Sequence, residues 1–276
     1  LARALFADRF PGFSRMEPVF RSAGIDRRQS AMPMDWYLEP RGWPERSKAY
    51  LDAALDLFIR SSRAALEDAG LGADQVDTIV TVSSTGIATP SLEARAMADM
   101  GFRTNVRRVP VFGLGCAGGA TGLALASRLA EASPGGVVLL VVVELCTLSF
   151  RSEDLTKAGI VATALFGDGA AACVLTTGRS GFARVRGAAE HSWPDTLDIM
   201  GWRIDETGLG VIFDRAIPPF ARDHLRPAVD DILQAQGLHL SDIDHLICHP
   251  GGTKVIQSIE TALSLDDGAL VHERAV

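Results

Sequence analysis

Cysteine and histidine are the residue types in this sequence best suited to nucleophilic chemistry, and one of each stands in a glycine-rich turn. Cys116 lies within VFGLGCAGG, residues 111–119, and His249 lies within LICHPGG, residues 246–252. A thiolate beside an imidazole forms an effective pair of nucleophile and base. The sequence therefore offers a thiol for covalent catalysis, provided that the fold brings these two distant residues together.

The stretch that follows Cys116 favours a reactive thiol. Residues 118–133, GGATGLALASRLAEAS, predict a helix, which places Cys116 at its N-terminus. Unpaired N–H groups and the positive end of the helix dipole stabilise an anion there, so we expect a lowered thiol pKa. The same N–H groups can hold a carbonyl oxygen as it becomes an oxyanion. A small cysteine that merely fills a tight turn is the alternative.

The same turn also spells G-x-G-x-x-G from Gly113 onward, the phosphate-binding pattern of dinucleotide-binding folds. Glu144 ends the next predicted strand, about where such folds place a ribose-binding carboxylate. Three features oppose this interpretation. Pro110 interrupts the strand that would be central, more than a hundred residues come first, and the Cys116 side chain occupies the phosphate turn. We therefore favour the nucleophile.

The composition excludes several classes of protein. The chain has 276 residues, 47% of them hydrophobic, and a net charge of −7, which disfavours nucleic-acid binding. The four cysteines lie far apart without C-x-x-C spacing, so we expect no metal site and reduced thiols in a cytoplasmic protein. No stretch reaches the roughly 18 apolar residues of a membrane-spanning helix.

Apolar and helical stretches alternate along the chain and must position these turns. Strands are predicted over 76–84, 106–114, 136–145, within 161–178, and over 183–192 and 243–252. Helices are predicted over 47–70, 91–100, 118–133, 218–238 and 253–265. Near-continuous apolar strands indicate a mostly parallel sheet covered on both faces. We place a domain boundary near Gly178, which gives domains 1–178 and 179–276, the second repeating the strand–helix alternation of the first.

Four stretches in this order resemble the type III polyketide synthases, the chalcone and stilbene synthase family: GLGCAGGATGLALA, ALFGDGAAACVL, TGLGVIFDRAIPP and CHPGGTKVI. VVVELCTLSFR and MGWRIDETGLGVIF look most similar to the bacterial members that make alkylpyrones and alkylresorcinols. The resemblance covers nearly the whole chain. It implies an α/β fold of the thiolase type, with αβαβα layers built from two similar halves, here with the C-terminal half incomplete.

The resemblance also implies an acyltransferase mechanism and its substrates. Cys116 would take a starter acyl group from its coenzyme A thioester, while His249 would pair with the thiolate and donate to malonyl-CoA. Decarboxylation would give an enolate that attacks the acyl thioester, and the extended chain would cyclise to a pyrone, a resorcinol or a related product. The resemblance implies a homodimer and requires no metal or redox cofactor.

The resemblance assigns further residues to the substrate pocket. Phe166 matches the gatekeeper aromatic between the CoA tunnel and the cavity, although a core phenylalanine is the alternative. Val211 falls where chalcone synthases have a second gatekeeper, and Trp202 falls where they have a glycine. Cys146 and Ser149 fall on or near positions that shape the pocket. A floor of small side chains predicts a fatty acyl-CoA starter.

The resemblance also bears on the mouth of the CoA tunnel and on the third catalytic residue. Basic residues that could bind the CoA phosphates are Arg15, Arg21, Arg27, Arg28 and Lys254, with a solvated basic face as the alternative. The family triad is Cys–His–Asn, but the only asparagine here is Asn105, and the family's asparagine would lie beyond Val276. We therefore expect a longer natural protein, and little condensation activity from these 276 residues alone.

Two other functions stay open at this point. A ketoacyl-ACP synthase III of fatty acid synthesis also uses Cys, His and Asn, but its histidine usually sits in H-Q-A-N rather than H-P-G-G. A non-catalytic thiolase-fold subunit is the other alternative. The presence of both Cys116 and His249 argues against it.

Overall fold

A four-stranded sheet forms the centre of the computed structural model, which describes residues 1–275. Its strands are β1 (Thr78–Val82), β2 (Arg107–Val111), β3 (Val138–Leu145) and β4 (Asp168–Leu175), in the order β2-β1-β3-β4. β1 pairs in parallel with β2 and β3, whereas β4 runs antiparallel to β3. The four strands predicted before residue 178 are confirmed, and the antiparallel β4 makes the sheet mixed.

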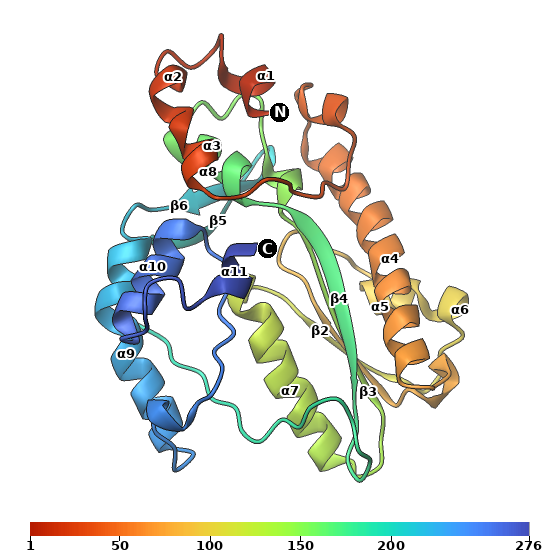
Figure 1. The fold of residues 1–276 in the computed structure, drawn as a ribbon. Coiled ribbons are helices and arrows are strands. Elements are labelled where there is room, and N and C mark those ends of the chain that lie inside the picture. Colours follow the sequence, from red (N-terminus) through yellow and green to blue (C-terminus); the bar gives the residue numbers. More distant parts are fainter. Residues whose placement is uncertain (276) are drawn as a thin grey trace.

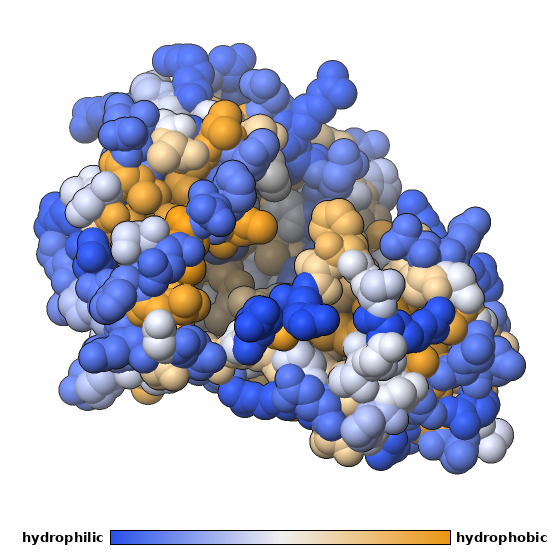
Figure 2. Space-filling model, turned by 60° about the horizontal axis from the view of Figure 1, so that its bottom comes forward, coloured by the Kyte–Doolittle hydropathy of each residue, from blue (hydrophilic) through white to orange (hydrophobic). Residues whose placement is uncertain are grey.

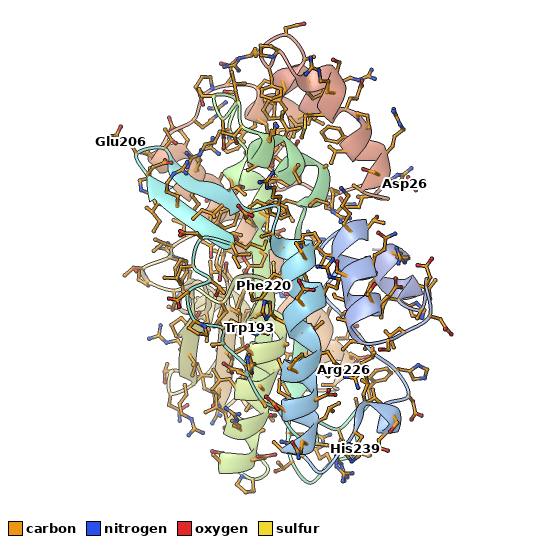
Figure 3. The ribbon with its side chains drawn as sticks, turned by 90° about the vertical axis from the view of Figure 1, so that its left-hand side faces the viewer. Asp26, Trp193, Glu206, Phe220, Arg226 and His239 are labelled. Atoms are coloured by element: carbon orange, nitrogen blue, oxygen red, sulfur yellow. The ribbon has the colours of Figure 1, made fainter. Side chains whose placement is uncertain are left out.

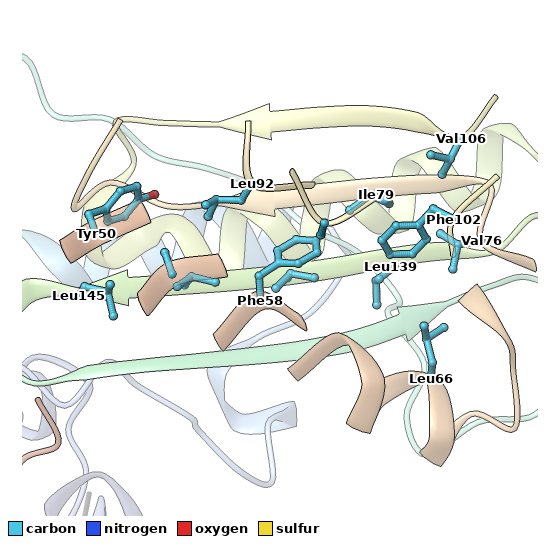
Figure 4. Close-up of a cluster of buried hydrophobic side chains, with 14 of the residues drawn as sticks. Tyr50, Phe58, Leu66, Val76, Ile79, Leu92, Phe102, Val106, Leu139 and Leu145 are labelled. Carbon is cyan, nitrogen blue, oxygen red and sulfur yellow. The ribbon is translucent and has the colours of Figure 1, made fainter. Parts of the chain in front are cut away.

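Two helices cover opposite faces of this sheet, α4 (Trp43–Asp68) and α7 (Gly118–Ala132) (Figure 1). Every fourth side chain of α4 from position 50 to position 66 is buried: Tyr50, Ala54, Phe58, Ser62 and Leu66. This spacing puts them on one helix face, which packs against β3 and β4. Figure 4 shows Phe58 among the buried side chains of this core.

Shorter helices surround the sheet and its ends. They are α1 (Ala2–Phe6), α2 (Phe13–Met16), α3 (Pro18–Ser22), α5 (Leu92–Arg95), α6 (Met97–Met100) and α8 (Lys157–Leu165). The predicted helix over 91–100 is thus two short helices. The N-terminal helices pack against α8 through a small core of Leu5, Phe6, Phe13 and Ile160. This contact places the basic N-terminal segment beside the turn that carries Phe166.

In the described residues after Gly178, the chain forms a two-stranded hairpin and three α-helices, besides a 3₁₀ turn at Leu240–Asp242. These are β5 (Met200–Asp205), β6 (Gly208–Phe213), α9 (Ile217–Gln234), α10 (Thr253–Ala262) and α11 (Val271–Ala275). Glu206 lies at the tip of the hairpin, and Trp193 packs edge-on against Phe220 of α9 (Figure 3). A hollow with hydrophobic walls opens on the face shown in Figure 2.

Two predicted strands, over 183–192 and 243–252, are wrong. Both segments are irregular, and within residues 1–275 neither pairs with a strand. The apolar run before His249 is not buried as a central strand would be, because Ile247 is 96% exposed. The hairpin β5–β6 was not predicted, since its turn has none of the Asn-Gly or Asp-Gly pairs that mark tight hairpins.

Candidate active site

Cys116 lies in a single 3₁₀ turn (Gly115–Ala117) between β2 and α7, and this confirms its place at a helix N-terminus. Its side chain is exposed. Gly113 and Gly115 have φ angles of 91° and 52°, which favour glycine. A Cβ on Gly118 would lie 2.7 Å from Val82 Cγ1. Every glycine of the G-x-G-x-x-G pattern therefore serves the turn or the close packing of α7 on β1.

The surroundings of this turn argue against a nucleotide loop. The strand that contains Pro110 is the edge strand β2, not a central strand. Glu144, the candidate ribose ligand, accepts hydrogen bonds from the backbone N–H of Ser84 at both carboxylate oxygens, at 2.9 and 3.1 Å. The carboxylate therefore holds the protein's own backbone.

The pKa of the Cys116 thiol is raised, which corrects the expectation of a lowered value. Its largest cause is desolvation by surrounding protein, and the second is the nearby Glu144 carboxylate. Part of the Cys116 side chain is exposed to water, while protein atoms farther away surround the sulfur and desolvate it. Within residues 1–275, no histidine contributes to the pKa of this thiol, and a backbone hydrogen bond at Cys116 only partly offsets the desolvation and the negative neighbour.

Glu144 is the most perturbed carboxyl group near the turn. It lies near the end of β3, where desolvation raises its pKa to about 7, partly offset by hydrogen bonds from Ser84 and Thr85. The group therefore changes charge near neutral pH. The pKa of the half-buried Cys146, just after β3, is also raised, chiefly by desolvation and then by Glu144 and Cys116. These three side chains form one electrostatically coupled group.

His249 follows the irregular segment before α10, and its carbonyl oxygen accepts a hydrogen bond from Gly251 N at 2.9 Å. Desolvation lowers the pKa of its imidazole, which favours the neutral form. The His249 side chain is nevertheless exposed, like that of Cys116. Part of its surface meets water, while the surrounding protein desolvates the ring. In the described residues no hydrogen bond joins His249 to Cys116, so their pairing stays a prediction.

Three of the predicted pocket residues come together around Phe166, which follows α8. Its ring centroid lies 6.1 Å from that of Trp202 and 6.4 Å from that of Phe213, with edge-to-face geometry. Val211 and Phe166 both pack against the cluster of Tyr37, Phe150 and Ala162. The hairpin that sequence reasoning missed therefore brings Trp202 and Val211 to the neighbourhood of Phe166, the predicted gatekeeper.

The turn after β3 carries the other two predicted pocket residues, Cys146 and Ser149. Ser149 is buried, and its hydroxyl donates to the carbonyl oxygen of Cys146 at 2.7 Å. Between them, Thr147 donates its N–H to Asp168 at 2.8 Å, and its hydroxyl bonds Tyr37 at 2.6 Å. Sequence reasoning missed Asp168, which ties this turn to the LFGDG turn, although it stands within that motif.

The predicted CoA-binding residues divide into two groups. Arg28 is half-buried and lines a cavity of about 210 Å³ with Gly24, Pro250 and Thr253. Thr253 donates its hydroxyl to the carbonyl oxygen of Ala23 at 3.0 Å, which brings the start of α10 beside the N-terminal segment. Arg15, Arg21, Arg27 and Lys254 are exposed. The structure thus places Arg28 at a cavity beside the turn that follows His249.

Metal-binding clusters and membrane-spanning helices are both absent from residues 1–275. No group of three or more His, Cys, Asp or Glu side chains in this part of the chain could hold a metal ion. None of its helices is both long and apolar enough to cross a membrane.

Comparison with known proteins agrees with this fold. Residues 43–179 match the N-terminal domain of chalcone and stilbene synthases. The chain is 41% identical to 1,3,6,8-tetrahydroxynaphthalene synthase of Streptomyces peucetius subsp. caesius, over 94% of this chain and 71% of that protein. It is 34% identical to a putative chalcone synthase of Bacillus subtilis (strain 168), over 100% of this chain and 79% of that protein.

A solved structure gives the same result. The crystal structure of 1,3,6,8-tetrahydroxynaphthalene synthase from Streptomyces coelicolor A3(2), a bacterial type III polyketide synthase, superposes with a TM-score of 0.93. It is 32% identical, and the match covers 100% of this chain and 78% of that chain.

The fold and the thiol-bearing turn define a condensing enzyme of the thiolase-like α/β class. Within that class, the chain belongs to the type III polyketide synthases, the chalcone and stilbene synthase family, which are acyltransferases. This membership sets aside the ketoacyl-ACP synthase III alternative.

Proposed function

We propose that Cys116 is the nucleophile of this polyketide synthase. Its thiolate sulfur attacks the thioester carbonyl of an acyl-CoA, forms an acyl-cysteine, and releases the CoA thiol, which takes up a proton. Malonyl-CoA then loses carbon dioxide and becomes an enolate. The enolate carbon attacks the acyl-cysteine carbonyl, which frees the Cys116 thiolate and leaves a chain extended on CoA. The observation that carries this proposal is an exposed thiol at the N-terminus of α7.

His249 is the proposed base and hydrogen-bond donor. Its pKa is lowered, so the imidazole is neutral near pH 7 and can take the thiol proton. This matters because desolvation and Glu144 hold the Cys116 pKa above its usual range. A thiolate at this position needs a partner cation, which protonated His249 supplies. The imidazolium can then donate to the carbonyl oxygen of malonyl-CoA.

Arg28 is the proposed contact for the CoA phosphates among the five basic residues. It lines the cavity that Pro250 and Thr253 also line, next to the turn of His249. A guanidinium suits phosphate oxygens because it presents several donors in a planar fork. Exposed Arg21, Arg27 and Lys254 lie on the two segments joined by Thr253 and add positive charge there.

The identity of the starter acyl group is a separate part of the proposal. The small side chains of Cys146 and Ser149 support the fatty acyl-CoA starter predicted from the sequence. The aromatic cluster of Phe166, Trp202 and Phe213 instead fills space near the gatekeeper position, which favours a short starter. The relatives named tetrahydroxynaphthalene synthase also support a hydroxylated naphthalene product, whose carbons malonyl units alone can supply. We therefore propose malonyl-CoA itself as starter and keep a fatty acyl-CoA as the second candidate.

Incubation of the protein in its full natural length with radiolabelled malonyl-CoA, alone and with medium-chain or long-chain acyl-CoAs, tests the starter. We expect a labelled hydroxylated aromatic product from malonyl-CoA alone, in an amount that added acyl-CoA does not increase. Pyrones or resorcinols that form only with an aliphatic acyl-CoA would instead establish the second candidate. A Cys116→Ser variant is the control, since it keeps the fold and loses the thiol.

A homodimer is the proposed assembly. Strand β2 is an edge of the sheet with a partner on one side only. Large hydrophobic side chains are exposed in the loops that follow β1 and β2: Ile87 and Phe112 are each 54% exposed. A second copy of the chain that pairs at this edge would cover both the open backbone groups and the exposed side chains.

A further inference from the structure

The three residues that follow β1, Ser83, Ser84 and Thr85, each hold a different neighbouring element through the side chain. Ser83 Oγ accepts a hydrogen bond from Tyr50 of α4 at 2.8 Å. Thr85 Oγ1 accepts from the backbone N–H of Leu145, the last residue of β3, at 2.8 Å. Ser84 lies between them in the sequence and is only 2% exposed, so the surrounding protein restricts the position of its side chain.

Ser84 Oγ reaches the turn that carries Cys116. It accepts hydrogen bonds from the backbone N–H groups of Gly113 and Gly115, at 3.2 and 3.1 Å. A hydroxyl oxygen has two lone pairs, so these bonds use its full capacity as an acceptor. Both glycines have positive φ angles, and their N–H groups have no hydrogen-bond partner in a strand or helix. One oxygen atom therefore fixes both bends of the turn.

Glu144 holds Ser84 in turn. The parallel register of β1 and β3 places Val82 opposite Val142, so Ser84 lies level with Glu144. Both carboxylate oxygens accept the Ser84 N–H. Glu144 of β3 thus contacts Ser84, and Ser84 contacts the backbone of Gly113 and Gly115, on either side of Leu114. Cys116 is the residue that follows Gly115.

We infer that Ser84 and Glu144 are positioning residues for the nucleophile: Ser84 fixes the turn of Cys116, and Glu144 fixes Ser84 while setting the negative field at the thiol. This inference rests on the proposed role of Cys116. The titratable groups that face Glu144 are Cys116 in the turn, Cys146 after β3, and Tyr50 of α4. Glu93 of α5 acts on Tyr50 as well. Of these, only Cys116 is exposed, and only Cys116 lies in the turn that Ser84 holds through Gly113 and Gly115.

Hydrogen–deuterium exchange tests the positioning without reference to activity. In Ser84→Ala the Gly113 and Gly115 amides lose their acceptor, so we expect roughly tenfold faster exchange in the peptide 111–119. Ser84→Thr keeps the acceptor and restores slow exchange. Ser127→Ala is the matched control, because Ser127 bonds only Ala124 within α7. Unchanged exchange in Ser84→Ala overturns the inference.

The pH profile of Cys116 alkylation by iodoacetamide, followed by peptide mass spectrometry, tests the part played by Glu144. Removing its charge in Glu144→Gln lowers the pKa of Cys116, so the midpoint of alkylation moves to lower pH. Glu131→Gln, on the exposed part of α7, leaves the midpoint in place. If the alkylation midpoint does not move in Glu144→Gln, the inference is overturned. This outcome decides the question even if Ser84→Ala fails to fold.

Acyl transfer separates this inference from the proposed function. If Cys116 is the nucleophile, Ser84→Ala lowers kcat roughly tenfold and leaves KM unchanged, as expected for a misplaced reacting atom. If the unmodified chain forms no acyl-cysteine, the proposed function fails, while exchange and alkylation still decide whether Ser84 and Glu144 act on the turn.

Discussion

At the scale of the residue, Cys116 combines a favourable position with an unfavourable environment. The helix N-terminus and the exposed sulfur suit a nucleophile, whereas desolvation and Glu144 raise the thiol pKa. Such a thiol is mostly protonated at neutral pH and becomes reactive when a base takes its proton. The proposed acyl transfer therefore depends on His249, whose lowered pKa leaves it neutral and able to accept that proton.

Glu144 gives a prediction about stability. Its pKa rises from 4.5 to about 7 on folding, so it favours the folded state fully below about pH 4.5. That contribution is lost as the pH rises through 7, by at most about 3 kcal/mol. Urea unfolding at about pH 5 and about pH 8 measures it. Between the lower and the higher pH, we expect the free energy of unfolding to fall more in the unmodified chain than in Glu144→Gln. Equal changes in both proteins would contradict the assignment.

At the scale of the element, the hairpin β5–β6 brings two predicted pocket residues to Phe166. One contact that holds it is the ion pair of Arg151 and Asp205, at 2.7 Å, in which the Arg151 side chain is 9% exposed. Arg151 lowers the pKa of Asp205, so the carboxylate is charged throughout the physiological range. The pair thus fastens the second part of the chain to the turn after β3.

Asp205→Asn tests this attachment. The substitution weakens a charge-assisted hydrogen bond and leaves a buried guanidinium poorly paired, so we expect a loss of about 1–3 kcal/mol in unfolding free energy. Fluorescence of Trp202, which lies on the hairpin, should also report greater solvent access. Glu206→Gln at the exposed hairpin tip is the control and should leave both readings unchanged. An Asp205→Asn variant as stable as the control would rule out the attachment.

Elements that depend on local pattern could be predicted from the sequence, and those that depend on distant partners could not. The strand β3 and the helix α4 follow from apolar runs and helical spacing. The apolar run before His249 also predicted a strand, but no neighbour within residues 1–275 pairs with it. In the site, Cys116, His249 and Phe166 stand in recognisable turns. The role of Ser84 depends on the register of β1 against β3, which the sequence does not display.

At the scale of the whole molecule, the open edge of β2 predicts self-association. We expect light scattering after size exclusion to give the mass of a dimer. Ile87→Asp places a charge in the exposed loop after β1 and should shift the protein towards monomer. Ile204→Asp is the matched control, since Ile204 is 62% exposed on the hairpin instead. A monomeric unmodified protein would contradict the proposed assembly.

The central claim is that Cys116 accepts an acyl group from coenzyme A with the help of His249. Intact-protein mass spectrometry after brief incubation with an acyl-CoA measures this directly, and peptide mapping identifies the modified residue. We predict one acyl adduct, located on Cys116, which is absent in Cys116→Ser and forms more slowly in His249→Ala. An adduct that persists in Cys116→Ser, or that maps to Cys146, Cys173 or Cys248 in the unmodified protein, would contradict it.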